Sequence, residues 1–216
     1  MDQIQDFMKM EQRIKKEKFV FLNQLAKKGE TLFVGSSLME QFPINELLMD
    51  QGSSQVVYNR GIGGFTTADM LEAMEEMVFG LEPSRIFINI GTNDISAPDY
   101  TLEKLMGNYR RILTQIKERL PEAQVTLMAY YPVNETDKLP EGEWGRHMFD
   151  SRNNANIRLA NEAAEKLAQE LGCRFVNVND GLTDERGMLK AEYTVEGVHM
   201  YANAYRVILE NLKPYL

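Results

Sequence analysis

The chain has 216 residues, of which 44% are apolar and 26% are charged, and both fractions are near the average for globular domains. A chain of this length is typically one domain, and its composition excludes a disordered chain, a collagen and a disulfide-stapled miniprotein. The 24 basic and 32 acidic side chains give a net charge of −8, which disfavours nucleic acids and anionic membrane surfaces as partners.

Cysteine and histidine are both scarce. One cysteine excludes an internal disulfide and a cysteine-clustered zinc site, and two histidines leave little for a metal centre. No run of about 18 apolar residues predicts a transmembrane helix, and residues 1–19 carry too many charges for a secretory signal. These features predict a soluble, reduced, cytoplasmic protein without a metal.

A helix is predicted over about 3–27, and Gly29 ends it. Because this helix precedes the first strand, it forms either a cover on the sheet or an arm that binds a partner. A second copy of the chain is one partner that such an arm could bind, in a homodimer. Residues 1–29 are therefore an N-terminal helical extension of a single predicted domain that spans 1–216.

Short apolar runs predict five buried strands. They are Thr31–Val34, Gln55–Tyr58, Arg85–Ile90, Gln124–Ala129 and Arg174–Val178. Helical spacing of apolar residues is found around 70–78, 102–120, 157–171 and 205–212. Strands and helices that alternate in this way, with right-handed crossovers, predict an α/β fold: a three-layer αβα sandwich with a mainly parallel sheet.

Site residues are expected in the loops beyond the carboxyl ends of the strands, where ligands of open α/β sheets bind. Gly35, Ser36 and Ser37 follow the first strand. Ser37 with Glu40 three residues later fits a capping box. A serine at a helix N-terminus also suits a nucleophile, because the helix dipole favours developing negative charge. The pattern alone favours the cap, and the two roles are compatible.

A glycine-rich stretch, 59–67, follows the second strand. It fits a dinucleotide-binding turn poorly, because the sixth position of that motif is Thr66 and the stretch does not follow the first strand. Gly64 instead lets the backbone approach a ligand closely, with its N–H available to an anion. A plain tight turn explains the same glycines.

Two further blocks carry polar side chains. Asn93 and Asp94 follow the third strand, and the Asn93 amide can donate to an oxyanion, although such a pair also forms turns. Near the C-terminus, Glu196 precedes His199 by three residues. A histidine titrates near neutrality, as a general base requires, and the carboxylate can fix its tautomer. A lone histidine is nevertheless more often structural.

The segment 131–149 leaves the fourth strand and therefore lies near the same edge of the sheet. Loops of this length are usually functional lids or disordered. Trp144 in this segment could wall a substrate pocket, and Asp94 is a second candidate for substrate binding. A mobile surface loop is the alternative interpretation.

The order of these blocks resembles the SGNH/GDSL hydrolase superfamily. The residues that carry the resemblance are Gly35-Ser36-Ser37-Leu38, Asn59 with Gly61 and Gly63-Gly64, Gly91-Thr92-Asn93-Asp94, and Glu196 with His199. Within the superfamily the chain is most similar to the platelet-activating-factor acetylhydrolase-type branch, over about 31–205. The resemblance implies a flavodoxin-like sandwich with five parallel strands in the order 2-1-3-4-5. It also implies hydrolysis of acyl esters or thioesters without a metal or other cofactor.

The resemblance also implies a role for each block. Ser37 is the nucleophile and His199 is its base. The oxyanion hole consists of the Ser37 N–H, the Gly64 N–H and the Asn93 side chain.

Two positions depart from the family pattern, because Ser36 and Glu196 stand where the family usually has aspartate. The glutamate side chain is one methylene longer. It either orients His199 or leaves a Ser–His dyad in which a backbone carbonyl accepts the Nδ1–H. Asp180 and Asp184 are reserve candidates for the same role.

The expected activity is cleavage of a small-molecule ester with a short, acetyl-like acyl group, and the acyl length comes from the branch that the chain resembles. One alternative is a catalytically inactive ligand-binding module on the same fold. The other is a flavodoxin-like nucleotide or flavin binder that uses Gly61–Gly64.

Overall fold

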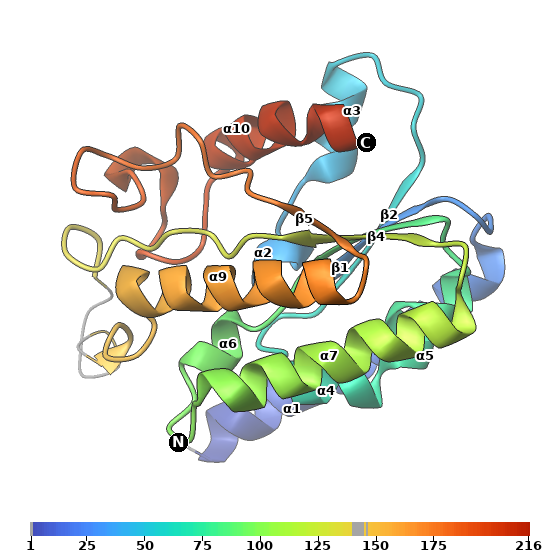
Figure 1. The fold of residues 1–216 in the computed structure, drawn as a ribbon, viewed down its shortest axis with the longest axis horizontal. Helices are drawn as coiled ribbons and strands as arrows, with labels where there is room; N and C mark the ends of the chain where they lie inside the picture. The colour runs from blue at the N-terminus through green and yellow to red at the C-terminus, as the bar shows by residue number, and fades with distance from the viewer. Residues whose placement is uncertain (1, 140–144, 146) are drawn as a thin grey trace.

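Five parallel strands form the central sheet, in the order β2-β1-β3-β4-β5 (Figure 1). The computed structural model describes residues 2–139, 145 and 147–216. The strands are β1 (Thr31–Gly35), β2 (Val57–Gly61), β3 (Arg85–Asn89), β4 (Gln124–Met128) and β5 (Arg174–Val176). The predicted fold class and strand order are thereby confirmed.

Helices cover both faces of this sheet. In Figure 1, α3 and α10 lie on one face, and α4, α5 and α7 lie on the other, with α9 packed against α7. The predicted helix around 70–78 is divided at Ala73 into α4 and α5. The helices are α1 (Asp2–Leu25), α2 (Ser37–Glu40), α3 (Ile44–Asp50), α4 (Thr67–Glu72), α5 (Met74–Met77), α6 (Thr92–Ile95), α7 (Leu102–Arg119), α9 (Asn154–Glu170) and α10 (Ala202–Leu212), with 3-10 turns η1 (Phe79–Leu81), η2 (Ala191–Tyr193) and η3 (Lys213–Tyr215).

The central strands are apolar because helices cover them on both sides. All five residues of β1 are buried, and the Phe33 ring packs against Phe87 of β3 with 5.0 Å between the ring centroids. On α7, Leu105, Tyr109 and Ile112 are buried at intervals of three and four residues, which is the spacing of one helix face. No helix in the described part of the chain has both the length and the apolar character needed to cross a membrane.

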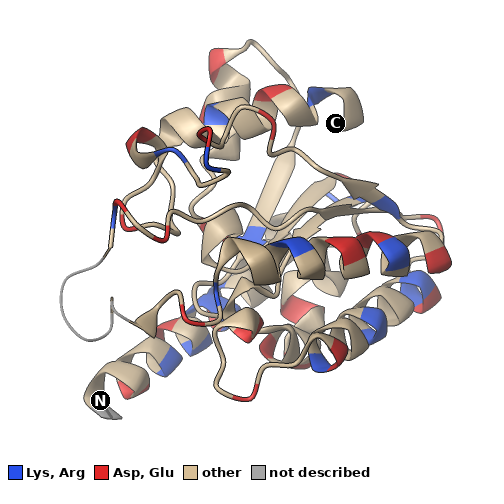
Figure 2. Cartoon of the chain, turned by 60° about the vertical axis from the view of Figure 1, so that its left-hand side comes forward, with Lys and Arg blue, Asp and Glu red and all other residues tan. Residues whose placement is uncertain are grey.

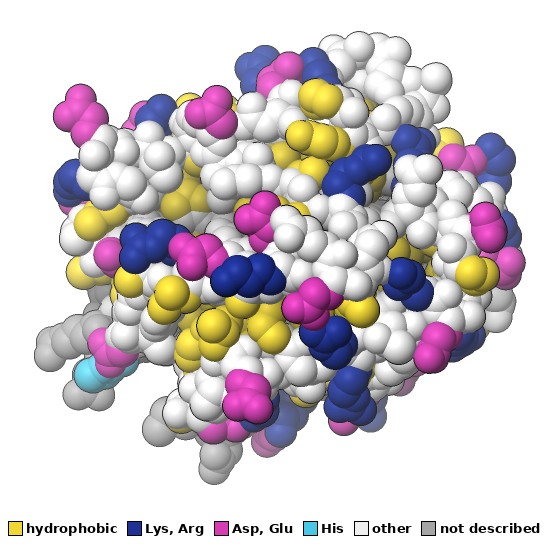
Figure 3. All heavy atoms as spheres, viewed as in Figure 1, with side chains coloured by type: hydrophobic (Ala, Val, Ile, Leu, Met, Phe, Trp, Pro, Cys, Tyr) yellow, Lys and Arg dark blue, Asp and Glu magenta, His cyan; other side chains and the backbone are white. Residues whose placement is uncertain are grey.

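Acidic and basic side chains are mixed over the face of the molecule shown in Figure 3. Lysine and arginine side chains lie beside aspartate and glutamate side chains along the helices of that face. This face therefore has no continuous basic track of the kind that binds a nucleic acid backbone.

The second strand lies later in the sequence than predicted. The expected strand was Gln55–Tyr58, whereas β2 extends to Gly61 and includes residues that the pattern placed in a loop. Arg60 in this strand is only 5% exposed. Its Nε donates to Asn23 Oδ1 of α1 at 3.0 Å, and its guanidinium lies 4.8 Å from the centroid of the Phe19 ring. Helix α1 thus supplies the partners that let a charged side chain occupy a strand.

The register of β2, β1 and β3 brings three loops to one level of the sheet. Gly35 at the end of β1 pairs with Gly61 of β2 on one side and with Asn89 of β3 on the other. The loops that follow these residues therefore start side by side at the carboxyl edge of the sheet.

Gly61 allows α2 to lie directly on β2. A Cβ atom at Gly61 would lie 2.2 Å from Glu40 N and 2.6 Å from Glu40 Cα, distances too short for any side chain. The backbone of α2 therefore sits as close to the strand as a glycine permits.

We predict that Gly61→Ala lowers the free energy of unfolding by about 1–3 kcal/mol, because the new methyl group pushes α2 off the strand. The matched control is Gly107→Ala, on the exposed side of α7 with no atom within 4 Å of the new Cβ. This control should raise stability by about 0.5–1 kcal/mol, since alanine favours a helix over glycine. Urea unfolding of both variants measures the difference, and an equal response of the two would contradict the close contact.

Candidate active site

Ser37 is the first residue of α2, and its hydroxyl points to a histidine. Its Oγ lies 2.9 Å from His199 Nε2. The N-cap of α2 is Ser36, and no side-chain cap bond forms there. The capping box predicted for Ser37 and Glu40 is therefore wrong. The local pattern could not reveal the partner of Ser37, which lies 162 residues later.

The other ring nitrogen of His199 faces a carboxylate. His199 Nδ1 lies 2.5 Å from Glu196 Oε1, and the same oxygen accepts the His199 backbone N–H at 3.1 Å. Asp184 instead accepts hydrogen bonds from the backbone and side chain of Arg186. Of the alternatives left open by the sequence, the structure thus places the Glu196 side chain at Nδ1.

A tight loop turns Glu196 back onto His199. Thr194 and Met200 form an antiparallel bridge around it, and Thr194 Oγ1 accepts the Gly197 N–H at 2.9 Å. Gly197 has a φ of +96°, and a Cβ there would lie 2.5 Å from the Asn134 carbonyl oxygen. The loop therefore depends on glycine at this position.

Glu196 is held in its ionised form. Burial raises the pKa of this carboxyl, but the hydrogen bonds and charge of His199, with the charge of Arg152, lower it by more. The net pKa is below the usual value for glutamate, so the group is a carboxylate at neutral pH. It can therefore bind an Nδ1–H and leave the lone pair of Nε2 directed at Ser37.

Gly63 is held on both sides, at its carbonyl and at its N–H, and its carbonyl belongs to the peptide that carries the Gly64 N–H. Gln12 Nε2 of α1 donates to the Gly63 carbonyl at 2.8 Å, and the Gly63 N–H donates to Glu40 Oε2 at 2.6 Å. Lys15 of α1 forms an ion pair with the same Glu40 carboxylate. Because a trans peptide is planar, its N–H points opposite to its carbonyl. The Gly64 N–H is therefore directed away from Gln12.

Asn93 lies in α6 and is oriented by Arg152. Arg152 Nη2 donates to Asn93 Oδ1 at 3.0 Å, while Asn93 Nδ2 donates to the Phe65 carbonyl at 2.9 Å. These bonds fix which end of the amide is which and leave its second N–H for a ligand. Arg152 is only 8% exposed, and burial lowers its pKa to about 10 against the opposing charge of Glu196, so it is still a cation at neutral pH.

Ser37, His199 and Asn93 line one pocket, with a volume of about 380 Å³. Helix α1 forms one wall of it, and in Figure 2 this helix begins at the end of the chain marked N, below the loops. The lining residues are Phe7, Met8, Glu11, Gln12, Lys15, Ser37, Gly63, Gly64, Asn93, Met148, Arg152 and His199. The sequence indicated neither Gln12 nor Arg152, because no local motif marks them.

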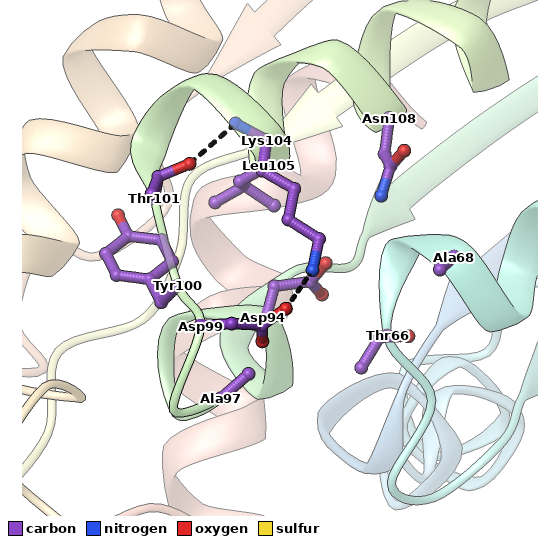
Figure 4. Close-up of a pocket in the computed structure, with 10 residues that line it drawn as sticks. All are labelled: Thr66, Ala68, Asp94, Ala97, Asp99, Tyr100, Thr101, Lys104, Leu105 and Asn108. Atoms are coloured by element: carbon purple, nitrogen blue, oxygen red, sulfur yellow. Dashed lines mark hydrogen bonds and ion pairs between the residues drawn. The ribbon is translucent and has the colours of Figure 1, made fainter.

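Asp94 does not line this pocket. Its carboxylate accepts the Thr67 N–H at 2.9 Å and also binds the Thr67 hydroxyl. Burial raises its pKa, and the bonds from Thr67 oppose that shift. It faces a smaller pocket of about 110 Å³ between α4 and the start of α7 (Figure 4). Asp94, which the sequence suggested as a substrate contact, therefore lies outside the Ser37 pocket, because Thr67 holds its carboxylate.

The segment 131–149 contributes to the pocket through Met148. Trp144, the predicted pocket wall, lies outside the described residues. His147 is exposed and its Nδ1 lies 2.7 Å from Asp150 Oδ2. Across residues 2–139, 145 and 147–216, the acidic, histidine and cysteine side chains do not gather in a group of three that could hold a metal ion.

Residues 33–207 match the family of GDSL-like lipases and acylhydrolases. The chain belongs to this family. The match begins within β1 and ends within α10, so it includes Ser37, Gly64, Asn93 and His199 and leaves out α1. This GDSL-family protein is a carboxylic ester hydrolase, and the resemblance inferred from its sequence is confirmed.

Individual relatives differ in how much of their length is matched. A solved structure from Streptococcus pneumonia, provisionally described as a platelet activating factor, is 31% identical with a TM-score of 0.88 and matches over 99% of this chain and 96% of its own. Platelet-activating factor acetylhydrolase IB subunit alpha2 of Rattus norvegicus is 24% identical over 86% of this chain and 75% of its own. The N-acylneuraminate cytidylyltransferase of Escherichia coli is 24% identical over 88% of this chain, which spans only 40% of that longer protein.

Proposed function

We propose that this GDSL-family protein hydrolyses esters with a short, acetyl-like acyl group through a Ser37–His199–Glu196 triad and an acyl-enzyme. The observation that carries the proposal is the chain of contacts from Ser37 Oγ through both nitrogens of His199 to Glu196 Oε1, at 2.9 and 2.5 Å. This is the arrangement by which a base activates a serine and a carboxylate orients the base.

In the first half of the reaction, Ser37 Oγ attacks the acyl carbonyl carbon while His199 Nε2 takes the hydroxyl proton. The tetrahedral intermediate then collapses, and the leaving alcohol takes that proton from His199. In the second half, a water gives a proton to His199 and attacks the acyl-enzyme. Release of the carboxylic acid returns the proton to Ser37.

The oxyanion of each tetrahedral intermediate would be bound by the Ser37 N–H, the Gly64 N–H and the Asn93 amide. Ser37 is at the start of α2, where backbone N–H groups have no partner inside the helix. The Gly64 N–H is directed away from Gln12 by the bond on the Gly63 carbonyl. Asn93 is held by Arg152 at its oxygen and by Phe65 at one N–H, so its second N–H is left for the oxyanion. Donors held in place before the reaction stabilise the developing charge most.

The pocket supports a small acyl group. Its volume of about 380 Å³ must hold both the acyl group and the alcohol. The rat relative is named for the release of an acetyl group. A panel of p-nitrophenyl esters of increasing acyl length tests this part of the proposal, and we expect acetate and propionate to be the best substrates.

The geometry of the glycine-rich stretch disfavours the nucleotide-binding alternative. The Gly63 N–H donates to Glu40, and Gly61 is pressed against the Glu40 backbone. The Glu40 carboxylate at this turn repels a phosphate. Few backbone N–H groups of the turn remain free to bind a phosphate. The cytoplasmic location and the homodimer expected from the sequence stay predictions.

We predict that Ser37→Ala lowers kcat for p-nitrophenyl acetate by roughly 10⁵-fold or more, because the nucleophile is lost. The variant should keep the circular dichroism and melting temperature of the parent. Ser84→Ala, at the opposite edge of the sheet, serves as the control and should retain activity. A fluorophosphonate should label the parent and the control but not Ser37→Ala, and unchanged hydrolysis by Ser37→Ala would refute the nucleophile.

We predict that Glu196→Gln reduces kcat by roughly 10²–10⁴-fold, which is less than the loss in His199→Ala. The amide can still accept a hydrogen bond but cannot stabilise the imidazolium as a carboxylate does. Steady-state kinetics of both variants with the same ester measures the two losses. Equal losses would mean that His199 does not function without the carboxylate. If Glu196→Gln kept full activity, Glu196 would not be a member of the triad.

We predict that Gln12→Ala lowers kcat about tenfold with little change in KM, because the Gly63–Gly64 peptide loses the bond that orients its N–H. Gln24→Ala, an exposed glutamine on the same helix, is the matched control. In Gln12→Glu the new carboxyl donates to the carbonyl only when protonated. Its kcat relative to the parent should therefore rise as the pH falls toward about 4.3. A loss of activity that is independent of pH would indicate a structural role only.

A further inference from the structure

Helix α1 contacts the rest of the protein largely through polar side chains. Gln12 binds Gly63, Lys15 pairs with Glu40, and Asn23 Nδ2 donates to the Glu76 carbonyl at 2.8 Å. The apolar contribution on this side is small, with Phe19 and Ala26 only partly buried. Polar bonds rather than an apolar face therefore hold α1 to the rest of the chain.

The apolar side of α1 is left exposed. Six large apolar side chains along one flank have between 47% and 85% of their surface accessible. We call this flank the α1 stripe, and it consists of Ile4, Phe7, Met8, Phe21, Leu22 and Leu25. A helix on a globular protein normally buries its apolar side and exposes its polar side. An apolar flank left exposed on a helix marks a surface that another molecule covers.

Two opposite charges interrupt the α1 stripe. Glu11 and Lys18 are exposed, and neither has an ion-pair partner among the residues that the structure describes. They are seven residues apart, which is about 10.5 Å along a helix, so they do not pair within one helix. They lie at equal distances from the midpoint between Ile14 and Lys15.

We propose that the α1 stripe is covered by α1 of a second copy of this chain, running antiparallel. A two-fold axis between Ile14 and Lys15 places Glu11 of each copy opposite Lys18 of the other. The same axis places Ile4 opposite Leu25, Phe7 opposite Leu22 and Met8 opposite Phe21. One symmetry operation therefore matches both charges and all six apolar residues of the stripe.

Other registers and other occupants fit the stripe less well. A register that sets Phe7 opposite Leu25 also sets Glu11 opposite Phe21, which buries a carboxylate on an aromatic ring. A membrane surface gives Glu11 no partner, and the net charge of −8 disfavours anionic lipid.

The antiparallel pair also changes the catalytic pocket, and this part rests on the proposed function. Phe7 and Met8 belong both to the stripe and to the lining of the Ser37 pocket. In the pair, Leu22 and Phe21 of the second copy face them. Each copy thus completes the apolar rim of the other copy's pocket, where the substrate enters.

Light scattering over a range of protein concentrations tests the pairing without any measurement of hydrolysis. The parent should be a dimer. Lys18→Glu places like charges together twice and should raise the dimer dissociation constant at least about tenfold. Glu11→Lys combined with Lys18→Glu restores opposite charges and should restore the dimer. Lys9→Glu, the same substitution on the exposed polar flank of α1, is the control and should remain dimeric.

Three results would overturn the proposal: a parent that is monomeric at all concentrations, a dimer that Lys18→Glu leaves intact, or a double substitution that stays monomeric. Circular dichroism of each variant separates dissociation from unfolding.

The contribution to the pocket has its own readout. Phe21 is about 20 Å along α1 from Met8, so it reaches a Ser37 pocket only in the partner. Phe21→Ala should raise the KM for p-nitrophenyl butanoate about threefold or more at concentrations where the variant is still dimeric. An unchanged KM in the dimeric variant would show that the second copy does not contribute Phe21 to the pocket. If the parent is inactive, the proposed function fails while the light-scattering test of the pairing still stands.

Discussion

The pairing of β1 with β2 on one side and with β3 on the other is the constraint on which the site depends. Gly35, Gly61 and Asn89 lie at one level, and Ser37, Gly64 and Asn93 follow them by two, three and four residues. A shift of one strand by a single residue would reverse which face each of its side chains occupies. The three candidate oxyanion donors meet because the sheet sets their starting points, and the loops need only a few residues to bring them together.

Much of this arrangement could be predicted from the sequence because it follows from local patterns. Continuous apolar runs indicate buried parallel strands, and the order of the serine, glycine, asparagine and histidine blocks indicates which loops share an edge. The strand order and the pairing of Ser37 with His199 are implied by the resemblance to the SGNH/GDSL superfamily, whereas the register is seen only in the structure. The local pattern failed where one residue type serves two purposes: Ser37 with Glu40 has the spacing of a capping box, yet each of the two binds a distant partner.

The contacts that no pattern marked are those between elements far apart in the chain. Arg60 could be placed in a strand only with knowledge of Asn23 and Phe19 on α1. Arg152 has no motif around it, although its bond to Asn93 settles the orientation of that amide. Gln12 lies in a helix outside every motif, although its bond to Gly63 holds the glycine-rich turn. In each case the role of the residue depends on its contact with a distant partner, and neither residue of the pair has a feature in the sequence that marks this contact.

The helix that walls the pocket lies outside the residues that define the family, which begin at position 33. A change in α1 therefore alters the pocket wall while Ser37, His199 and Glu196 stay as they are. Two relatives that share every block can accept different esters if their first thirty residues differ, and substrate preference can drift without any change at the reacting atoms.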